Sequence, residues 1–371
     1  MLELFQMERS FANVLRRKVL GGRPFWPLVM LAKYLRIKAA RARNAPLCVP
    51  IFASLSVTKR CNSRCGICRL GGDGSPRGSE LSAAELKRLA EELKEAGTEV
   101  IGVTGGEPLL RPDIFEIFSH IKGLGLGLHL STNGSLLDED AAARLLDSGP
   151  DWVNVSVDGV TAATHDALRG VRAFEDLKAR LRNFVRLRDA RRSPVRLNLV
   201  MVLNALNLEE APELPALGRE LGADAVGFMP FHMLDLEGPE AAKLRVRDLG
   251  KAGAALARIF EAKRGGLVQN TDAYLGLFER CFRGEPSPVD CYAMYSSIAV
   301  DPEGGVYPCF PKLQLGEKLG SLRGGSLKDF LKSPVLARGC GAARNCRYCY
   351  WNCHTELNLV FNGLARALLG R

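Results

Sequence analysis

Three cysteines near the start of the chain have a spacing that could bind a metal centre. They lie in the stretch TKRCNSRCGIC, at Cys61, Cys65 and Cys68, and no fourth cysteine or histidine lies close by. Structural zinc sites are closed by four ligands, and iron–sulfur clusters are usually held by four thiolates. Three ligands leave one metal position free for a small molecule, which is the arrangement of an open catalytic site.

The elements that must position these thiols alternate between strands and helices. Segments whose apolar residues recur with helical periodicity lie between the β-rich runs. One of these predicted helices begins with a capping box at Ser82 and Glu85. Parallel strands need crossover connections, so the alternation predicts a parallel sheet, either open and doubly wound or part of an incomplete barrel. Both architectures bind ligands beyond the carboxyl ends of the strands, where the three cysteines lie. The predicted strands are 52–58, 99–105, 128–132, 152–159, 195–202 and 225–231.

The cysteine spacing resembles that of the radical SAM superfamily. That family carries Cys-x3-Cys-x2-Cys after the first strand of a partial (β/α)6 barrel, often with a bulky residue before the last cysteine, which is Ile67 here. The resemblance implies an α/β fold with a partial (β/α)6 TIM-like barrel. It also implies a 4Fe–4S cluster on Cys61, Cys65 and Cys68 whose open iron binds S-adenosylmethionine. Reductive cleavage would give a 5′-deoxyadenosyl radical that abstracts hydrogen from a substrate.

Segments at the ends of later strands resemble the family's S-adenosylmethionine contacts: TGGEP, STNG, VSVDG and, further on, HDALRG. The resemblance places Glu107 on the methionine amino group and Arg169 on its carboxylate, which the guanidinium fork matches. Phe231 would lie beside adenine. We give His129, His165 and His232 no catalytic role. The residues expected around the cofactor are Gly105, Gly106, Glu107, Ser131, Thr132, Asn133, Ser156, Asp158, Arg169 and Met229.

Seven of the eleven cysteines lie between Cys281 and Cys353. The stretch SSIAVDPEGGVYPC predicts a strand, a turn and a returning strand that ends at Cys309, and CRYCYWNC follows later. A hairpin ending in cysteine can face a Cys-x2-Cys loop and complete a tetrahedral thiolate site. Structural zinc is one interpretation of such paired thiols.

The hairpin, in which four residues separate Gly304 from Cys309, also resembles the SPASM and twitch domains that follow many radical SAM barrels. A full SPASM domain carries Cys-x2-Cys-x5-Cys-x3-Cys and binds two extra 4Fe–4S clusters. In this chain the cysteine expected at the x5 spacing after Cys349 is absent, and no cysteine follows Cys353. We therefore expect one auxiliary 4Fe–4S cluster, which takes an electron from the substrate radical or binds substrate. Its expected ligands are Cys291, Cys309, Cys346 and Cys349, with Cys353 as the substitute. Cys281 and Cys340 stay unassigned, which leaves a second cluster open.

Length and composition fit a large α/β domain with a smaller cysteine-rich addition. The chain has 371 residues, 47% apolar and 25% charged, as in ordinary soluble proteins. No cysteine occurs from Arg69 to Arg280, which favours metal ligation in a reducing cytosol over a disulfide framework. We expect a basic amphipathic segment (1–50), the barrel (51–265), a small β-hairpin/helix auxiliary domain (275–358) and a C-terminal tail (359–371).

The positive charge is concentrated at the start of the chain. Residues 1–47 contain ten basic and two acidic residues, which accounts for eight of the ten net positive charges. A nucleic-acid-binding protein would spread its basic surface over the folded body, so we expect no nucleic-acid partner. The apolar run FWPLVMLA is too short to span a bilayer, and no secretory signal is evident. Residues 1–47 are then a basic amphipathic helix on an anionic membrane surface, or else a packing arm or partly disordered basic tail, in a cytoplasmic protein.

Two classes of function are compatible with these features. A radical SAM enzyme, an oxidoreductase or a transferase, would act on a peptide, sugar or lipid and would need a low-potential electron donor such as flavodoxin or ferredoxin. A non-catalytic, zinc-stabilised basic binding protein would explain the paired thiols and the charge. It would not explain three thiols at the end of the first strand or Gly-Gly-Glu at the end of the second.

Overall fold

The structure is a computed structural model that describes residues 22, 24–68, 70, 79–232 and 239–369. The predicted alternation of strands and helices is confirmed in residues 52–263. Its elements are β1 (Phe52–Ser56), α3 (Ala83–Glu95), β2 (Val100–Thr104), η1 (Pro108–Leu110), α4 (Ile114–Gly123), β3 (Gly127–Thr132), α5 (Glu139–Ser148), β4 (Trp152–Ser156), α6 (Ala162–Arg169), α7 (Phe174–Ala190), β5 (Arg196–Leu203), η2 (Ala211–Glu213), α8 (Leu214–Glu220), β6 (Ala225–Pro230), α9 (Pro239–Leu244) and α10 (Leu249–Lys263).

An N-terminal helix and a C-terminal group of short elements complete the chain. These are α2 (Trp26–Ala42), α11 (Asp272–Leu275), α12 (Phe278–Phe282), β7 (Ser297–Val300), β8 (Gly305–Tyr307), α13 (Phe310–Gln314), β9 (Gly320–Ser321), α14 (Leu327–Lys332), α15 (Pro334–Asn345) and α16 (Asn352–Leu369). None of the helices in the described ranges is both long and apolar enough to cross a membrane.

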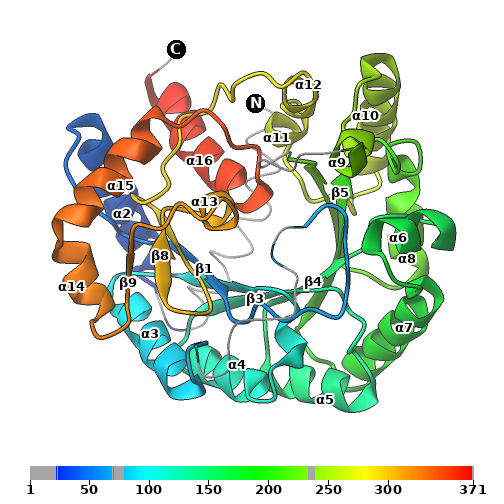
Figure 1. Ribbon diagram of the computed structural model, residues 1–371, viewed down its shortest axis with the longest axis horizontal. Helices are drawn as coiled ribbons and strands as arrows, with labels where there is room; N and C mark the ends of the chain where they lie inside the picture. Colours follow the sequence, from blue (N-terminus) through cyan, green and yellow to red (C-terminus); the bar gives the residue numbers. More distant parts are fainter. Residues whose placement is uncertain (1–21, 23, 69, 71–78, 233–238, 370–371) are drawn as a thin grey trace.

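The sheet shows which of the two predicted architectures the chain adopts. Its strand order is β6-β5-β4-β3-β2-β1-β7-β8-β9, and β1 to β6 are all parallel. Consecutive strands are neighbours throughout, without the reversal of order that defines a doubly wound sheet. Helices α3, α4, α5, α7 and α8 surround the curved sheet on its outer side (Figure 1). The fold is therefore a partial (β/α)6 barrel.

The C-terminal hairpin is part of the same sheet. β7 pairs in parallel with β1, and β8 then pairs with β7 in the antiparallel direction, as the predicted turn at residues 301–305 requires. The free edge of β1 would otherwise expose unpaired backbone groups. The cysteine-rich segment is thereby joined by backbone hydrogen bonds to the strand that precedes Cys61.

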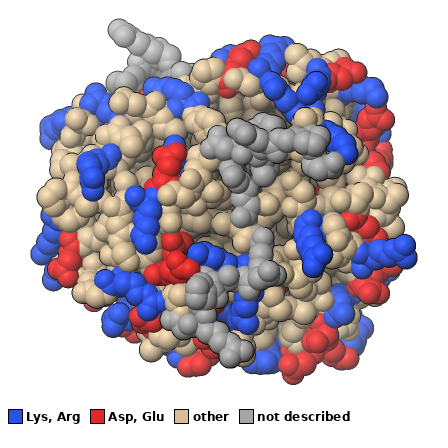
Figure 2. All heavy atoms as spheres, in the orientation of Figure 1, with Lys and Arg blue, Asp and Glu red and all other residues tan. Residues whose placement is uncertain are grey.

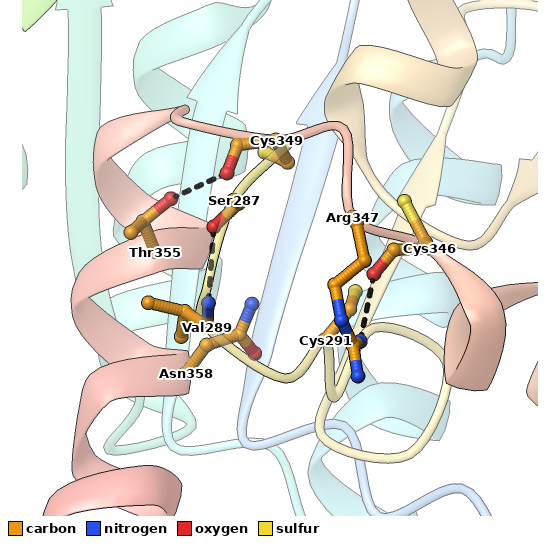
Figure 3. A pocket seen from close by; sticks show the side chains of 8 residues that line it. All are labelled: Ser287, Val289, Cys291, Cys346, Arg347, Cys349, Thr355 and Asn358. Atoms are coloured by element: carbon orange, nitrogen blue, oxygen red, sulfur yellow. Dashed lines mark hydrogen bonds between the residues drawn. The ribbon is translucent and has the colours of Figure 1, made fainter. Parts of the chain in front are cut away.

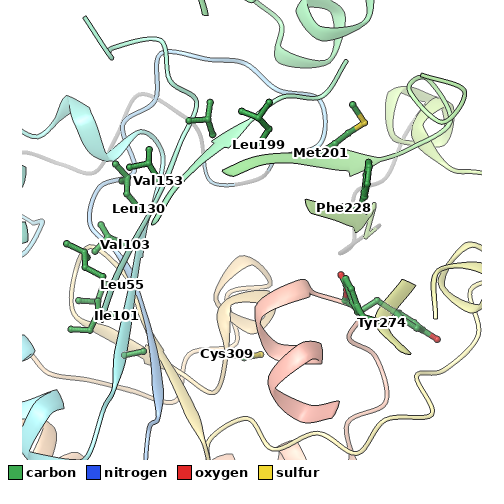
Figure 4. Packing of buried hydrophobic residues seen from close by; sticks show 14 of the residues in the cluster. Leu55, Ile101, Val103, Leu130, Val153, Leu199, Met201, Phe228, Tyr274 and Cys309 are labelled. Atoms are coloured by element: carbon green, nitrogen blue, oxygen red, sulfur yellow. The ribbon is translucent and has the colours of Figure 1, made fainter. Parts of the chain in front are cut away.

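The two faces of the barrel strands differ in polarity. Side chains on the outer face, from Leu55 on β1 to Met201 on β5, pack against the surrounding helices and form one continuous apolar core (Figure 4). Side chains alternate across a strand, so the intervening residues face the lumen of the barrel. Val100, Val200, Val202 and Met229 are apolar residues on this inner face, but many of the inner residues are polar or small: Ser54, Ser56, Gly102, Thr104, His129, Ser131, Asn154, Ser156, Asn198 and Gly227.

Candidate functional site

The three cysteines lie in a loop at the carboxyl end of β1, as predicted. Cys61 and Cys65 are partly exposed, Cys68 is exposed, and all three thiols are free. The loop is held from two sides by backbone hydrogen bonds. Arg64 donates to the carbonyl of Arg169 at 3.1 Å, and Glu107 donates to the carbonyl of Arg60 at 2.7 Å. The thiols are thus placed between the end of α6 and the Gly-Gly-Glu segment that follows β2.

The electrostatic surroundings of these thiols fit a group that binds thiolates. Burial raises the pKa of Cys61 and of Cys65, and nearby thiols raise both further. Arg169 opposes this at Cys65, where its Nη1 donates to Sγ at 3.4 Å. Thiols that resist ionisation alone but lie within electrostatic reach of one another are stabilised as thiolates by a shared positive centre.

Gly105 and Gly106 are explained by the cysteine loop itself. Gly105 has φ +143°, and a Cβ there would stand 2.5 Å from the carbonyl oxygen of Thr58. At Gly106 a Cβ would stand 2.1 Å from the carbonyl oxygen of Arg60. The family resemblance assigns these glycines to cofactor contact. The structure shows in addition that only glycine lets the two loops approach so closely.

This close approach gives the first testable prediction. Gly106→Ala should displace the backbone around Arg60, cost about 1–3 kcal/mol of stability and reduce cluster binding at Cys61, Cys65 and Cys68. Gly341→Ala is the matched control, because nothing lies within 4 Å of its added Cβ in helix α15. Thermal melting and iron content measure the two effects. Equal iron in both variants would show that the loops tolerate a larger separation.

Glu107 is fully buried and organises the neighbouring loop. Its carboxylate accepts hydrogen bonds from Thr132 Oγ1 at 2.7 Å, from the amide of Asn133 at 2.8 Å and from the amide of Leu109 at 3.1 Å. Burial raises the pKa of Glu107, and these hydrogen bonds lower it. Arg169 lies within electrostatic reach of this carboxylate but forms no ion pair with it among the described residues, so the carboxylate can still accept a hydrogen bond from the amino group of a ligand.

The polar residues after β3 have different surroundings from one another. Thr132 is buried on Glu107, while Asn133 Nδ2 donates to Asn62 Oδ1 at 2.8 Å and to Ser63 Oγ at 3.1 Å in the cysteine loop. Both side chains are therefore occupied by protein contacts. Ser131 is exposed and lies on the lumen side of β3.

Asp158 and Arg169 form a buried ion pair beside Cys65. Arg169 Nε lies 3.0 Å from Asp158 Oδ2, and Asp158 Oδ1 accepts the amide of Val202 at 3.0 Å. Burial alone would lower the pKa of Arg169, but Asp158 and Cys65 raise it. The guanidinium is thus charged and held in one orientation, with further N–H groups available for an anion.

Met229 and Phe231, both expected beside adenine, lie in different environments. Met229 is partly exposed on the lumen side of β6. Phe231 is buried in a small apolar cluster with Leu168 and Leu244, against which Ile67 packs. The bulky residue before Cys68 thus anchors the cysteine loop to the barrel. Ser156, at the end of β4, is partly exposed on the lumen side.

The lumen contains a polar layer that the sequence motifs did not indicate. Asn198 is buried, and its Nδ2 donates to Asn154 Oδ1 at 2.8 Å, while its Oδ1 has no partner among the described groups. Gln269 lies nearby, because a Cβ on Gly227 would stand 3.2 Å from its Nε2. Asn154 and His129 are partly exposed although they lie within strands. The lumen is therefore not filled by apolar side chains as a closed barrel is.

Five cysteines gather where the C-terminal hairpin meets the start of α16. Figure 3 shows Cys291, Cys346 and Cys349 beside a small pocket whose other walls include Asn358 and Thr355. Cys291 and Cys346 lie within electrostatic reach of each other, and their interaction raises the pKa of Cys291 and lowers that of Cys346. The other three thiols of the group are Cys309, Cys349 and Cys353. Burial raises the pKa of each, and each lies within electrostatic reach of another thiol of the group.

Cys340 lies apart from this group. It neighbours Cys48 and Tyr295, and its thiol donates to the carbonyl of Leu47 at 3.8 Å. Cys281 lies in α12, where burial raises its pKa to about 12, and Tyr274 lies within electrostatic reach of Cys281 as well as of Cys349 and Cys353. Within the described ranges, no set of three or more His, Cys, Asp or Glu side chains is placed to hold a single metal ion.

Comparison with known proteins agrees with this geometry. Residues 55–215 match the model of the radical SAM superfamily, and residues 291–354 match that of an iron–sulfur cluster-binding domain, SPASM. The chain thus carries a radical SAM domain followed by a C-terminal SPASM domain. The first domain implies a 4Fe–4S cluster and S-adenosylmethionine, and the second implies an auxiliary iron–sulfur cluster.

The relatives differ in what they act on. An AdoMet-dependent heme synthase of Methanosarcina barkeri is 34% identical over 177 residues, which is 47% of this chain and 49% of that protein. A probable GTP 3′,8-cyclase of Methanothermobacter thermautotrophicus is 37% identical over 46% of this chain and 54% of its own length. The chain thus spans about half the length of the curated relatives it matches.

Solved structures resemble the whole fold. Streptococcus suis SuiB bound to S-adenosylmethionine matches with a TM-score of 0.64 at 17% identity, over 83% of this chain and 74% of SuiB. The protein anSMEcpe with bound AdoMet matches with a TM-score of 0.61 at 16% identity, over 86% of this chain and 99% of its own. At such identities the similarity shows the fold, the partial barrel with its C-terminal extension.

Proposed function

We propose that this chain is a radical SAM enzyme whose cleaving cluster is bound by Cys61, Cys65 and Cys68. When bound, the cluster and S-adenosylmethionine supply a 5′-deoxyadenosyl radical that takes a hydrogen atom from the substrate. The observation that carries the proposal is the convergence of three free thiols, buried Glu107 and buried Arg169 at one end of a parallel barrel. Glu107 would accept a hydrogen bond from the methionine amino group, and Arg169 would bind its carboxylate.

The other residues expected around the cofactor differ in whether they could contact it directly. Ser131, Ser156 and Met229 lie on the lumen side of their strands, where a nucleoside could reach them. Three further residues would contribute indirectly. The Glu107 carboxylate is held by Thr132 and Asn133, and Arg169 is oriented by Asp158. Gly105 and Gly106 let that loop meet the cysteines.

The proposal is tested by anaerobic incubation of the reconstituted protein with S-adenosylmethionine and dithionite. Mass spectrometry should detect 5′-deoxyadenosine and methionine in equal amounts. A low-potential donor such as flavodoxin or ferredoxin should replace dithionite. A protein that carries iron but forms no 5′-deoxyadenosine would contradict the proposal.

We propose that the auxiliary cluster is bound by Cys291, Cys309, Cys346 and Cys349. Cys353, in the first turn of α16, lies within electrostatic reach of Cys309 and Cys349 and is the substitute ligand. The group lies where α16 meets the sheet, since His354 of α16 packs against Phe52 of β1 with ring centroids 6.0 Å apart. This position suits electron transfer from a substrate radical, or contact with the substrate itself.

We infer that the lumen receives the reacting part of the substrate, which is uncharged and forms hydrogen bonds. The polar layer contains amides and a histidine, and its charged neighbour Arg196 lies at the far, amino end of β5 against Trp152. The relatives' names include heme synthases and GTP cyclases, and SuiB has been solved with its precursor peptide. A charge-free layer favours an amide or a hydroxyl group at the reacting carbon over a carboxylate.

Asn198→Leu tests this inference. An extract of the source cells grown in deuterated medium should label 5′-deoxyadenosine with deuterium in the wild type, because the radical takes its hydrogen from the substrate. We expect about tenfold less label in the variant, which loses the buried amide, while total 5′-deoxyadenosine persists. Equal labelling in both proteins would place the substrate elsewhere.

We also propose a contact between α2 and an anionic membrane surface. Four apolar side chains on this helix and at its start are more than half exposed: Phe25 (72%), Leu28 (63%), Leu31 (52%) and Leu35 (56%). The basic side chain of Arg36 is exposed beside them, whereas Lys33 is paired with Glu99 at 2.6 Å. Residues 1–21 and 23, part of the same expected segment, lie outside the described residues. Over the face seen in Figure 2, basic and acidic side chains are interspersed.

Vesicles test this contact. The double variant Leu31→Glu with Leu35→Glu should bind phosphatidylglycerol-containing vesicles at least about tenfold more weakly than the wild type, because it loses two apolar side chains and gains charge repulsion. Leu206→Glu is the matched control, since Leu206 is also 52% exposed but follows β5. Equal co-sedimentation of the three proteins would rule the contact out.

A further inference from the structure

His232 links the barrel to the cysteine-rich loop. It lies two residues after the end of β6, is only 8% exposed, and its Nε2 accepts the backbone N–H of Tyr350 at 2.8 Å. Tyr350 directly follows Cys349 in the sequence. A single hydrogen bond thus spans from the carboxyl end of a barrel strand to the residue beside a proposed auxiliary ligand.

The histidine ring is fixed as an acceptor by its surroundings. Rings of Tyr348, Tyr350 and Trp351 surround it, with centroids 6.0, 6.0 and 6.2 Å away. All three belong to the segment between Cys346 and Cys353. Burial lowers the pKa of His232 to about 4, so the ring is neutral near pH 7 and Nε2 keeps its lone pair.

The loop needs such contacts because it has no regular secondary structure. Residues 346–351 lie between α15 and α16 and form no helix or strand. Other contacts on Tyr350 come from the C-terminal half of the chain: its hydroxyl donates to the carbonyl of Glu285 at 2.9 Å, and its carbonyl accepts from Tyr274 at 2.8 Å. Among these contacts, the bond to His232 is the one that comes from the barrel.

We propose that His232 is a positioning residue for the auxiliary cluster. By accepting the Tyr350 amide it fixes the orientation of the backbone at Cys349, and hence the direction of that thiolate and of the N–H groups around it. Hydrogen bonds around the thiolates tune the spectrum, potential and retention of an iron–sulfur cluster. This inference rests on the proposed assignment of Cys349 as a ligand.

Two substitutions separate the hydrogen bond from the packing. His232→Phe keeps an aromatic ring among Tyr348, Tyr350 and Trp351 but has no acceptor, and His232→Gln restores an acceptor oxygen. Both are made in the full chain carrying alanine at Cys61, Cys65 and Cys68, so that only the auxiliary cluster contributes to the spectrum. His165→Phe is the control, because His165 is also buried but packs against Phe174 in another part of the barrel.

Electron paramagnetic resonance of the reduced cluster and its loss to an iron chelator are the measurements. We expect His232→Phe to change the g-values and to lose iron about tenfold faster, whereas His232→Gln and His165→Phe behave as the parent. Unchanged spectra and rates in His232→Phe, or equal changes in the Gln and Phe variants, would overturn the proposal. If His232→Phe does not fold, a Gln variant with parental spectrum and rate supports it, and one with altered spectrum overturns it. A parent chain without any cluster would instead refute the auxiliary cluster itself.

Discussion

Replacing Cys65 with alanine is expected to reduce 5′-deoxyadenosine formation to background. Cys65 sits at the centre of the site, with Arg169 on its sulfur and the Asp158–Arg169 ion pair beside it. Three thiolates bind this 4Fe–4S cluster, and two are too few to retain it. The iron content should therefore fall by about four atoms per chain. Iron analysis and mass spectrometry of the product measure the two losses together.

Cys340→Ala provides the control for this substitution. Cys340 is also a free thiol, but it is buried beside Cys48 and Leu47, away from both groups of proposed ligands. It should retain wild-type iron and product, apart from a modest loss of stability from the small cavity. Full 5′-deoxyadenosine formation by Cys65→Ala would defeat the assignment of the cleaving cluster to the Cys61–Cys68 loop.

Removal of Cys291 and Cys346 together should abolish the auxiliary cluster and spare the first. Their thiols lie within electrostatic reach of each other, and Cys309 and Cys349 lie within electrostatic reach of Cys346. The double alanine variant should therefore lose about four iron atoms per chain and part of the visible absorbance. Formation of 5′-deoxyadenosine without conversion of the substrate should continue, because Cys61, Cys65 and Cys68 remain.

The single variant Cys353→Ala tests whether Cys353 is a ligand of the auxiliary cluster or only a substitute ligand. With four other thiols in place, it should keep its iron. Wild-type iron in the Cys291 and Cys346 double variant would show that this group does not hold a cluster. A colourless protein that binds zinc at these thiols would favour the structural-zinc interpretation of the hairpin.

The sequence predicted the barrel well because its determinants are local. Six β-rich runs, each followed by a helical period, correspond to β1 to β6, and the capping box at Ser82 and Glu85 starts α3. Periodicity could not choose between an open sheet and a barrel, since both have the same alternation. That choice depends on the order of strands in space, which here runs without reversal.

The continuation of the sheet into the cysteine-rich segment was not predictable from local pattern. The hairpin of β7 and β8 was expected, but its pairing with β1 joins residues about 240 positions apart, such as Phe52 and Ser297. Only the need to cover the edge of β1 argues for that pairing, and a sequence does not show which edge stays free.

The sequence located the site but not all of the reasons for its residues. The cysteine spacing placed three thiols at the end of β1, and Gly-Gly-Glu was expected to contact the cofactor. The structure adds that the glycines are required by the carbonyl oxygens of Thr58 and Arg60. Close approach between two loops arises from tertiary packing and leaves no mark in either loop alone.

Residues that face the lumen were also missed. Asn154 and Asn198 stand in register on β4 and β5, and Gln269 joins them from a segment that bridges to β6. One signal was present, because polar residues at alternate positions are unusual in parallel strands covered on both faces. The bond between His232 and Tyr350 joins residues 118 positions apart and could be seen only in the fold.

The central claim is that three thiolates hold a cluster whose free iron binds S-adenosylmethionine. The most direct test uses the chain with alanine at Cys291 and Cys346, reduced with dithionite, so that the barrel cluster alone gives an electron paramagnetic resonance signal. Addition of S-adenosylmethionine should shift its g-values, because the amino and carboxylate groups of the methionine join the iron. A spectrum that stays the same at saturating S-adenosylmethionine would contradict the claim.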